Sequence, residues 1–302
     1  QYPKAVESLE QALALYIEVG NLPASESELY TALAGQVTVF SNIAGIYHNL
    51  GQYAKARDFY QAALNTYQKL NQWLIAHQKA FSDKPGEAKT LNNIGDVYQN
   101  LGDYAKSIAF YQQALNTFKA IGDKAGQRTS LNNIAVAYGK QNQSAKALEF
   151  FNQALAIAIE IGDKAGETAI LNNLAAAYRN QSQYPQAIAS YQQALALEKE
   201  ISDKAGQGIT LTGLGSVYFK QNQYAKALEF YQPALAIAQE VSDKEGEAII
   251  LSNIGVVLEQ QQRPEIAIVF YKQSVNVRET IRQDIRSLSR EQQESYTQTV
   301  AN

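Results

Sequence analysis

The hydrophobic positions of this chain recur with a period of forty residues. The same pattern restarts at five leucines, Leu91, Leu131, Leu171, Leu211 and Leu251. In the copy that covers residues 91–130, apolar residues at helical spacing fill two stretches, which are separated by Gly102. Because a period of about 3.6 residues keeps each apolar set on one face, the pattern predicts two amphipathic helices joined by a tight turn.

The turns and helix ends carry their own signals. Within each pair, a left-handed residue is expected at Gly51, Gly102, Asn142, Ser182, Asn222 and Gln262. Between pairs, the sequence Ile121-Gly122-Asp123-Lys124 predicts that one helix ends at the glycine and the next begins at an aspartate cap. Serine replaces this glycine at Ser202 and Ser242, where we expect less sharply terminated helices.

Small and aromatic residues alternate along the second helix of each pair. One small-residue site holds Ala56, Ser107, Ala147, Ala187, Ala227 and Ala267, and another holds Ala63, Ala114, Ala154, Ala194, Ala234 and Ser274. An aromatic residue lies between the two sites at Tyr60, Tyr111, Phe151, Tyr191, Tyr231 and Tyr271. We predict that the small residues permit close helix approach and that the rings fill the core between the helices.

A period of this length is typical of stacked helical repeats in which each unit contacts only its neighbours. We therefore predict an all-α fold, a right-handed α-solenoid of antiparallel helix pairs that forms a single array over residues 1–302. The expected units are a partial first repeat (1–39), a repeat with an eleven-residue insertion (40–90), five further repeats (91–130, 131–170, 171–210, 211–250, 251–290) and the start of another helix (291–302).

The two ends of the array are irregular. The insertion covers residues 71–81, and eleven residues are about three helical turns, so a helix can be lengthened without rotating its apolar face. Residues 1–39 carry the same surplus, because Ala34-Gly35-Gln36 matches Ala125-Gly126-Gln127. Residues 284–302 are predicted to begin another helix, with a cap at Ser289. We expect this chain to be part of a longer protein.

This alternation of small and aromatic residues resembles the tetratricopeptide repeat, whose core motif is visible as Ile94-Gly95-Asp96-Val97-Tyr98. The length of forty residues resembles the subclass found in Pins-type polarity adaptors and kinesin light chains. The tail at residues 281–296 resembles a stretch in bacterial proteins that carry such repeats ahead of a CHAT domain, a caspase-like peptidase module. These resemblances imply a binding array, and the tail implies a recruiting or sensing arm of a protease-like protein.

Composition limits the partners. Twenty-six basic and twenty-nine acidic side chains give a net charge of −3. The chain therefore lacks the excess of basic residues that is typical of proteins that bind nucleic acid. No apolar run in the sequence approaches the length that a membrane span requires. There is no cysteine, which is compatible with a cytoplasmic location.

Catalytic chemistry is disfavoured by the residues available. Without cysteine, a thiol nucleophile and a Cys/His zinc site are impossible, and the histidines are His48 and His77. The abundant carboxylates, such as Glu149 and Glu229, fall on predicted solvated helix faces. We therefore expect no enzymatic activity, no metal and no cofactor within this chain.

The first helices of the pairs are expected to line the concave side of the solenoid. The candidate contact residues for a ligand on that side are His48, Asn92, Gln99, Asn100, Asn132, Lys140, Asn172, Arg179, Asn180, Thr212, Phe219 and Lys220. An asparagine side chain both donates and accepts, so a row of them suits the backbone of an extended peptide. The alternative role for such residues is a hydrogen bond between helices, which we assign to the neighbouring Asn93, Asn133, Asn173 and Asn253.

The predicted function is a protein-interaction scaffold that binds a peptide or protein segment in its groove. One alternative is a regulatory array whose change of curvature gates a downstream CHAT-type peptidase domain absent from this chain. Another is self-association through the terminal repeats, since an end without a polar outer face leaves apolar surface exposed.

Overall fold

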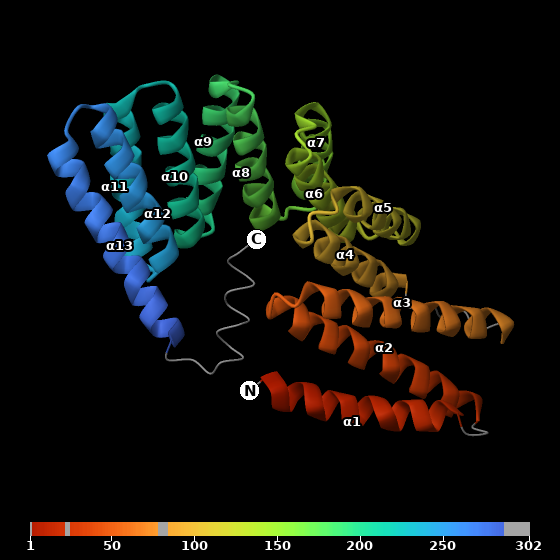
Figure 1. The fold of residues 1–302 in the computed structure, drawn as a ribbon. Coiled ribbons are helices and arrows are strands. Elements are labelled where there is room, and N and C mark those ends of the chain that lie inside the picture. The colour runs from red at the N-terminus through yellow and green to blue at the C-terminus, as the bar shows by residue number, and fades with distance from the viewer. Residues whose placement is uncertain (1, 22–24, 78–83, 287–302) are drawn as a thin grey trace. The chain divides into compact units, whose positions relative to one another are not determined.

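The structure is a computed structural model that describes residues 2–21, 25–77 and 84–286. In these ranges all regular structure is helical, which confirms the predicted all-α class (Figure 1). The helices are α1 (Tyr2–Asn21), α2 (Glu26–Asn49), α3 (Tyr53–Ala76), α4 (Lys84–Asn100), α5 (Tyr104–Ile121), α6 (Lys124–Lys140), α7 (Ser144–Glu160), α8 (Lys164–Asn180), α9 (Tyr184–Glu200), α10 (Lys204–Lys220), α11 (Tyr224–Glu240), α12 (Lys244–Gln260) and α13 (Pro264–Arg286).

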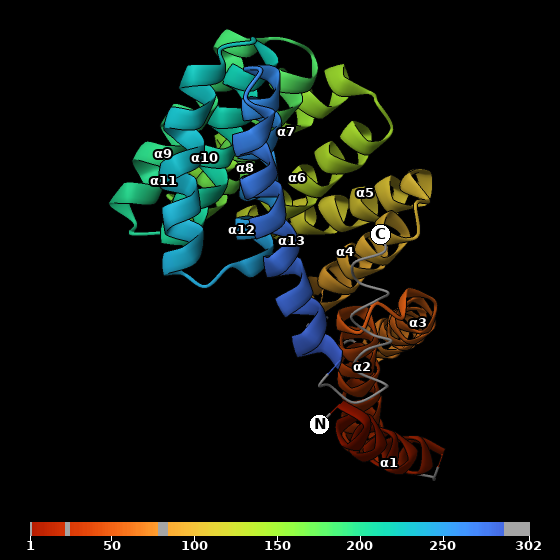
Figure 2. The ribbon, with the colours of Figure 1, turned by 60° about the vertical axis from the view of Figure 1, so that its left-hand side comes forward.

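The helices form two compact units. Unit 1 contains α1 to α6 and ends at Gln141, and unit 2 contains α7 to α13 and begins at Asn142. In each unit, helices that are consecutive in sequence pack side by side as α-hairpins (Figure 2). This arrangement is an α-solenoid of helix pairs, as predicted. A single continuous array over residues 1–302 stays a prediction.

Aspartate caps fix where the first helices begin. The Asp123 carboxylate accepts a hydrogen bond of 2.9 Å from the Gly126 amide, and Asp163, Asp203 and Asp243 cap α8, α10 and α12 in the same way. Each cap satisfies an amide that has no partner within the helix. The predicted boundaries at residues 131, 171, 211 and 251 therefore fall inside helices, and each helix pair begins seven residues earlier.

The prediction for Ser202 and Ser242 is wrong. Both serines adopt the left-handed backbone, with φ of 59° and 58°, and α9 and α11 end at the same register as α7. After Ser202, the Asp203 amide donates to the Glu198 carbonyl at 2.8 Å, the bond that closes a Schellman-type end. Because this bond and the following cap act together, the helix ends sharply even though serine disfavours the conformation.

The core follows the predicted alternation of small and aromatic residues. In the second helices, the alanine and serine sites are at most 4% exposed. Tyr60, Tyr111, Phe151, Tyr191 and Tyr231 are at most 5% exposed. Close approach is visible at Gly95, where an added Cβ would lie 2.4 Å from the ring of Tyr111, and at Gly215 and Gly255 against Tyr231 and Tyr271.

A stack of three side chains recurs on several pairs. Tyr98 of the first helix stacks on Phe110 of the second, with ring centroids 5.4 Å apart, and the Lys106 ammonium lies 5.2 Å from the centre of the Tyr98 ring. The same stack is formed by Tyr47, Phe59 and Lys55 and by Tyr218, Phe230 and Lys226. These contacts fix the first helix of a pair against the second.

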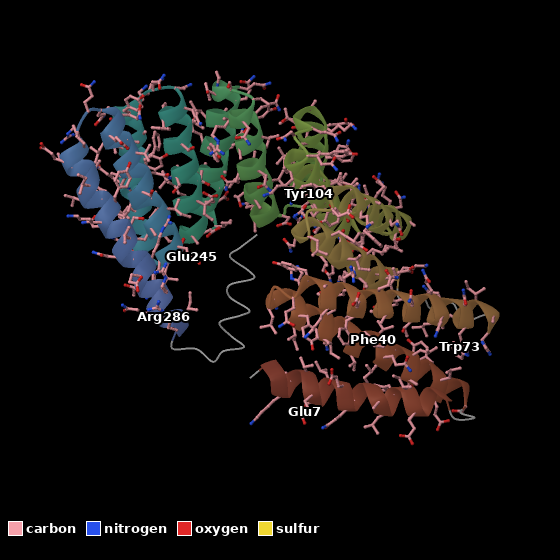
Figure 3. The ribbon with its side chains drawn as sticks, in the orientation of Figure 1. Glu7, Phe40, Trp73, Tyr104, Glu245 and Arg286 are labelled. Carbon is pink, nitrogen blue, oxygen red and sulfur yellow. The ribbon has the colours of Figure 1, made fainter. Side chains whose placement is uncertain are left out.

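The helices at the amino end are longer, as expected from the surplus. α3 has 24 residues where α5 has 18, and Trp73 lies on its added turns (Figure 3). The Trp73 ring packs against Tyr30 of α2, with centroids 6.2 Å apart. The register proposed for residues 34–36 is supported by a shared contact, since the Gln36 side chain donates to the Tyr16 carbonyl as Gln127 donates to that of Phe118. Insertion residues 78–81 lie outside the described ranges.

The carboxyl end differs from the expectation. Residues 284–286 complete the last turn of α13, a helix of 23 residues, and do not begin a new helix. The predicted cap at Ser289, the further helix at 291–302 and most of the CHAT-like tail lie outside the described residues.

One described helix also departs from the expectation about membranes. The segment Ser27–Asn49 of α2 is long and apolar enough to cross a membrane, with a mean hydropathy of 1.2. About 28% of that segment is buried inside the protein. Its apolar content contributes to the core, because Ala32, Ile43 and Ala44 are fully buried and α2 packs against both α1 and α3.

Candidate functional site

A hollow of about 390 Å³ lies in unit 1 between α4, α5 and α6. We call it the amide hollow; it is lined by Lys89, Asn92, Asn93, Asp96, Phe118, Asp123, Ala125, Gly126, Thr129 and Asn133. Two successive first helices form its walls, and Phe118 of the second helix lies between them. Gly126 makes this packing possible, because a Cβ there would lie 2.3 Å from the Phe118 ring.

A hydrogen-bond network built on Asp96 lines one side of the amide hollow. The buried Tyr111 hydroxyl donates to Asp96 Oδ1 at 2.7 Å, and Asn133 Nδ2 of α6 donates to the same oxygen at 3.3 Å. Burial raises the pKa of the Asp96 carboxyl, while the Tyr111 hydrogen bond and the charge of His48 lower it in part. Burial and the Asp96 charge together raise the pKa of Tyr60 to about 12. The network fixes the orientation of α4 against α6.

Two polar side chains of the amide hollow make no hydrogen bond within the described residues. Asn93 is half-buried and Lys89 is exposed, and both belong to α4. An amide that can donate and accept therefore lies beside a cation, and the Asp96 carboxyl lies one helical turn further along. This arrangement can hold the alternating donors and acceptors of a peptide backbone.

In the predicted row, Asn92 and Asn172 bond to neighbouring helices, whereas Asn132 and Thr212 bond within their own helices. Asn92 is 6% exposed, and its Oδ1 accepts a hydrogen bond of 3.1 Å from Ser130 of α6. In unit 2, Asn172 donates to Glu198 at 3.0 Å and accepts from Thr210 at 2.8 Å. Asn132 is half-buried and donates to Asn133 at 3.5 Å, and the Thr212 hydroxyl donates to the Gly208 carbonyl at 2.8 Å.

The role assigned to the neighbouring residues is confirmed for Asn133 and wrong for Asn93. Asn133 bridges α6 to α4 through Asp96, whereas Asn93 lines the hollow with its amide unpaired. Within α4, therefore, Asn92 makes the bond between helices and Asn93 faces the hollow. The two positions differ by about 100° around the helix axis, so this assignment depends on how the next first helix packs.

Three further candidates meet near the carboxyl ends of α2 and α4. The Asn100 amide nitrogen donates to His48 Nε2 at 3.2 Å, and the His48 ring packs edge-on against Tyr53 with centroids 5.5 Å apart. Gln99 is half-buried, and its Oε1 is buried without a hydrogen-bond partner. The structure brings these three side chains to one region, apart from the lining of the amide hollow.

The remaining candidates lie at the carboxyl ends of first helices. Arg179 donates to Ser216 at 3.1 Å and to Asn180 at 3.4 Å. Phe219 is half-buried against Tyr224, with ring centroids 5.8 Å apart. Lys140, Asn180 and Lys220 are exposed.

Sequence reasoning missed Lys89 and Glu198. The positions equivalent to Lys89 in the later repeats hold Thr129, Ala169, Ile209 and Ile249. Because the residue type changes from repeat to repeat, no sequence pattern identifies this row as a contact surface. Glu198 is 1% exposed, and the sequence could have indicated its burial. The equivalent positions in the other repeats hold the apolar residues Phe118, Ala158 and Ala238. A charged residue at a position that is apolar elsewhere indicates a buried polar contact, here the bonds from Asn172 and Thr210.

Within the described ranges there is no cluster of three or more His, Asp or Glu side chains that could hold a metal ion.

Family models described as "Tetratricopeptide repeat" match residues 86–160, 166–240 and 207–280, and a related one matches residues 37–72. No curated protein matches the chain in sequence.

Several solved structures share the fold. The apo form of RapI is 14% identical, with a TM-score of 0.66, 93% of this chain covered and 94% of that one. BtubC from P. vanneervenii is 19% identical, with a TM-score of 0.65, 76% of this chain and 92% of that one covered. The Rap conjugation gene regulator of the plasmid pLS20, solved in complex with the Phr* peptide, is 16% identical, with a TM-score of 0.58, 89% of this chain and 81% of that one covered.

Proposed function

Because this chain belongs to the tetratricopeptide repeat family, we propose that it is a protein-interaction scaffold that holds a peptide or protein segment against its first helices. The observation that carries the proposal is the amide hollow, where Asn93 and Lys89 present polar groups that have no hydrogen-bond partner among the described residues, beside the Asp96 network. The hollow lies between two successive first helices, the surface that the sequence predicts for ligand contact. In unit 1 the proposed surface includes Asn92 and Asn132, and the candidates of unit 2 belong to a proposed surface of their own unit.

The chemistry of the amide hollow favours an extended segment. The backbone of such a segment carries one donor and one acceptor per residue, and an asparagine side chain can satisfy both. An unpaired Lys89 at the mouth adds attraction for a carboxylate of the ligand. The peptide complex of the Rap conjugation regulator, which shares this fold, is consistent with such binding.

The test begins with selection of ligands from a library of random twelve-residue peptides on the intact chain. The affinity of the selected peptides is then measured for Asn93→Ala and Lys89→Glu. We expect each variant to weaken binding by about fivefold or more, because a hydrogen bond to a charged or polar group contributes about 1 kcal/mol or more. The matched controls are Asn116→Ala and Lys119→Glu, exposed residues of α5 that do not line the hollow.

Unchanged affinity in both amide-hollow variants would contradict the proposal for this site. Failure to select any peptide would contradict it for the whole chain. The described residues contain no observation in favour of the alternative, an array that gates a CHAT-type domain, because the tail that suggested it extends beyond Arg286.

A further inference from the structure

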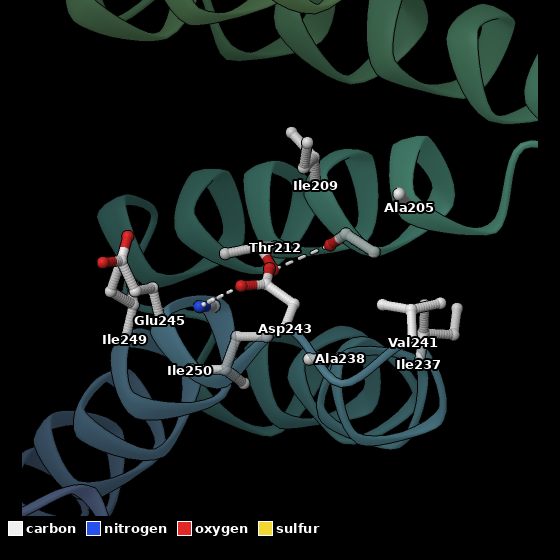
Figure 4. A pocket seen from close by; sticks show the side chains of 12 residues that line it. Ala205, Ile209, Thr212, Ile237, Ala238, Val241, Asp243, Glu245, Ile249 and Ile250 are labelled. Atoms are coloured by element: carbon white, nitrogen blue, oxygen red, sulfur yellow. Dashed lines mark hydrogen bonds between the residues drawn. The ribbon is translucent and has the colours of Figure 1, made fainter. Parts of the chain in front are cut away.

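A second hollow, of about 320 Å³, lies in unit 2 between α10, α11 and α12 (Figure 4). We call it the aliphatic hollow; it is lined by Ala205, Gly208, Ile209, Thr212, Ile237, Ala238, Val241, Asp243, Glu245, Gly246, Ile249 and Ile250. It occupies the same place in its helix triplet as the amide hollow does in unit 1. The two hollows differ in the side chains of one row, which holds Lys89 and Thr129 in unit 1 and Ile209 and Ile249 in unit 2.

Two small residues, Ala238 and Gly208, contribute to the lining of the aliphatic hollow. Ala238 lies at the register of Phe118, Ala158 and Glu198, and Phe118 lines the amide hollow of unit 1. Gly208 lies at the register of Arg128 and Thr168. An added Cβ at Gly208 would lie 3.2 Å from Ile237 Cγ2, so the backbone of α10 comes close to α11 at this point. Both residues line the aliphatic hollow.

The walls of the hollow are branched aliphatic side chains that remain open to solvent. Ile209 is 64% exposed, Ile249 is 50% exposed and Val241 is 40% exposed. In unit 1 the same row as Ile209 and Ile249 holds Lys89 and Thr129, as expected for exposed positions. Covering such apolar surface with another apolar group is favourable by roughly 25 cal/mol per Å².

The charged residues that line the hollow are both acidic. Asp243 and Glu245 lie at the start of α12, and Asp243 Oδ1 accepts from the Gly246 amide at 2.9 Å. The nearby lysines are engaged elsewhere, since Lys204 pairs with Glu240 at 3.4 Å and Lys244 with Asp284 at 2.7 Å. The rim is therefore complementary to a cation and unfavourable for an anion.

From these observations we infer that the aliphatic hollow binds a Leu, Ile or Val side chain of a peptide in which the next residue is lysine or arginine. The inference rests on the proposed function and names a specificity for it in unit 2. The occupant's side chain lies against Ile209, Val241 and Ile249, and its cation lies beside Asp243 and Glu245.

The test uses three acetylated and amidated hexapeptides in which Gly-Ser precedes and Ser-Gly follows a central pair. The pairs are Leu-Lys, Ala-Lys and Leu-Glu. Each peptide is titrated into the intact chain labelled at the isoleucine δ-methyl groups, and the nuclear magnetic resonance signals of Ile209 and Ile249, assigned with Ile209→Val and Ile249→Val, report binding at the hollow.

We expect the Leu-Lys peptide to shift both signals saturably. The Ala-Lys peptide should bind about tenfold more weakly, because it buries fewer methylene groups. The Leu-Glu peptide should bind about threefold or more weakly, with the difference reduced in high salt, because the charges at the rim are exposed.

One variant removes the apolar walls of the hollow. The double change Ile209→Thr with Ile249→Thr strips these walls without touching the core, with the signal of Ile237 as the reporter in that protein. It should abolish saturable shifts by Leu-Lys. Ile268→Thr, an equally exposed isoleucine of α13, is the matched control and should leave binding unchanged.

Three outcomes would overturn the inference: equal affinity for Leu-Lys and Ala-Lys, equal affinity for Leu-Lys and Leu-Glu at low salt, or binding that survives in the wall-stripped variant. Shifts of the Ile209 and Ile249 signals on dilution of the Ile268→Lys with Val275→Lys protein would also overturn it, because a second copy of the chain would then cover the hollow itself. These results are separable from a failure of the proposed function, which is judged on the amide-hollow variants of unit 1.

Discussion

Gly215 shows how tightly single residues are constrained where first and second helices touch. An added Cβ would lie 2.7 Å from Tyr231, whose side chain is 2% exposed and cannot move aside. We expect Gly215→Ala to destabilise the protein by about 1 to 2 kcal/mol, because overpacking outweighs the better helix propensity of alanine. Urea unfolding measures this change.

The control for that prediction is Gly139→Ala. Nothing lies within 4 Å of an added Cβ at Gly139, which is also helical and exposed. There alanine should stabilise by about 0.5 to 1 kcal/mol. If both substitutions change stability in the same direction, the contact between Gly215 and Tyr231 is not as described.

The buried Glu198 carboxyl predicts how the stability of the protein depends on pH. Burial raises the pKa of its carboxyl above the ordinary 4.5, the nearby Asp203 adds to the rise, and the hydrogen bonds from Thr210 and Asn172 oppose it. Its Oε2 is buried and has no hydrogen-bond partner in the part of the chain that the structure describes. Because the folded protein holds this proton more tightly than the unfolded chain does, the contribution of Glu198 to stability falls as pH rises from 4.5 through the raised value.

Glu198→Gln should therefore raise the thermal midpoint at pH 7 and raise it less, or not at all, at pH 4. Thermal unfolding followed by circular dichroism at the two pH values measures both shifts. Glu149→Gln, an exposed carboxylate of α7, should change neither midpoint appreciably. A larger gain for Glu198→Gln at pH 4 than at pH 7 would show that the sign is wrong.

At the scale of the helix, α11 contains a proline that its counterparts lack. Pro233 is exposed inside Tyr224–Glu240, and the same register holds Gln113, Gln153 and Gln193. Proline has no amide hydrogen for the carbonyl of Glu229, and its ring crowds that carbonyl. Pro233→Gln should stabilise unit 2 by about 1 to 3 kcal/mol, measured as a higher urea midpoint.

The corresponding control is Gln193→Pro in α9. It should destabilise by about 3 kcal/mol, because the helix loses a hydrogen bond that it now makes. Stability unchanged by both substitutions would show that α11 tolerates the proline at no cost.

Helix boundaries were predictable because their causes are local. A capping aspartate and a left-handed residue act within a few residues of the helix end, as Asp123 and Gly122 do. The misjudged ends at Ser202 and Ser242 show the limit, since hydrogen bonds around the turn override the preference of one residue. The exchange of roles between Asn92 and Asn93 depends on the packing of α6, which no local pattern reports.

At the scale of the whole molecule, the period predicted the solenoid of helix pairs but not the hollows within it. The amide and aliphatic hollows differ in one row of their lining, which holds Lys89 and Thr129 in unit 1 and Ile209 and Ile249 in unit 2. Periodicity places a side chain on a face. The residue type at each position decides what that face can bind.

The last described helix predicts self-association. On α13, Ile268 and Val275 are 50% and 63% exposed, while Leu228 and Leu235 at the same register of α11 are partly buried beneath α12. We expect the protein to associate as its concentration rises, and Ile268→Lys with Val275→Lys to prevent this without lowering the thermal midpoint. Light scattering across a dilution series measures it, and an invariant mass for the unmodified protein would contradict it.

The recurrence of the same cap and the same left-handed turn has a consequence for how such a chain can grow. Asp203 and Asp243 are each preceded by a left-handed serine and followed by a lysine that opens a helix. A tandem duplication of the gene segment for residues 204–243 would therefore join two ends whose junction already exists in the protein. Lengthening by recombination needs no new linker, and a binding surface can gain or lose one repeat in a single genetic event.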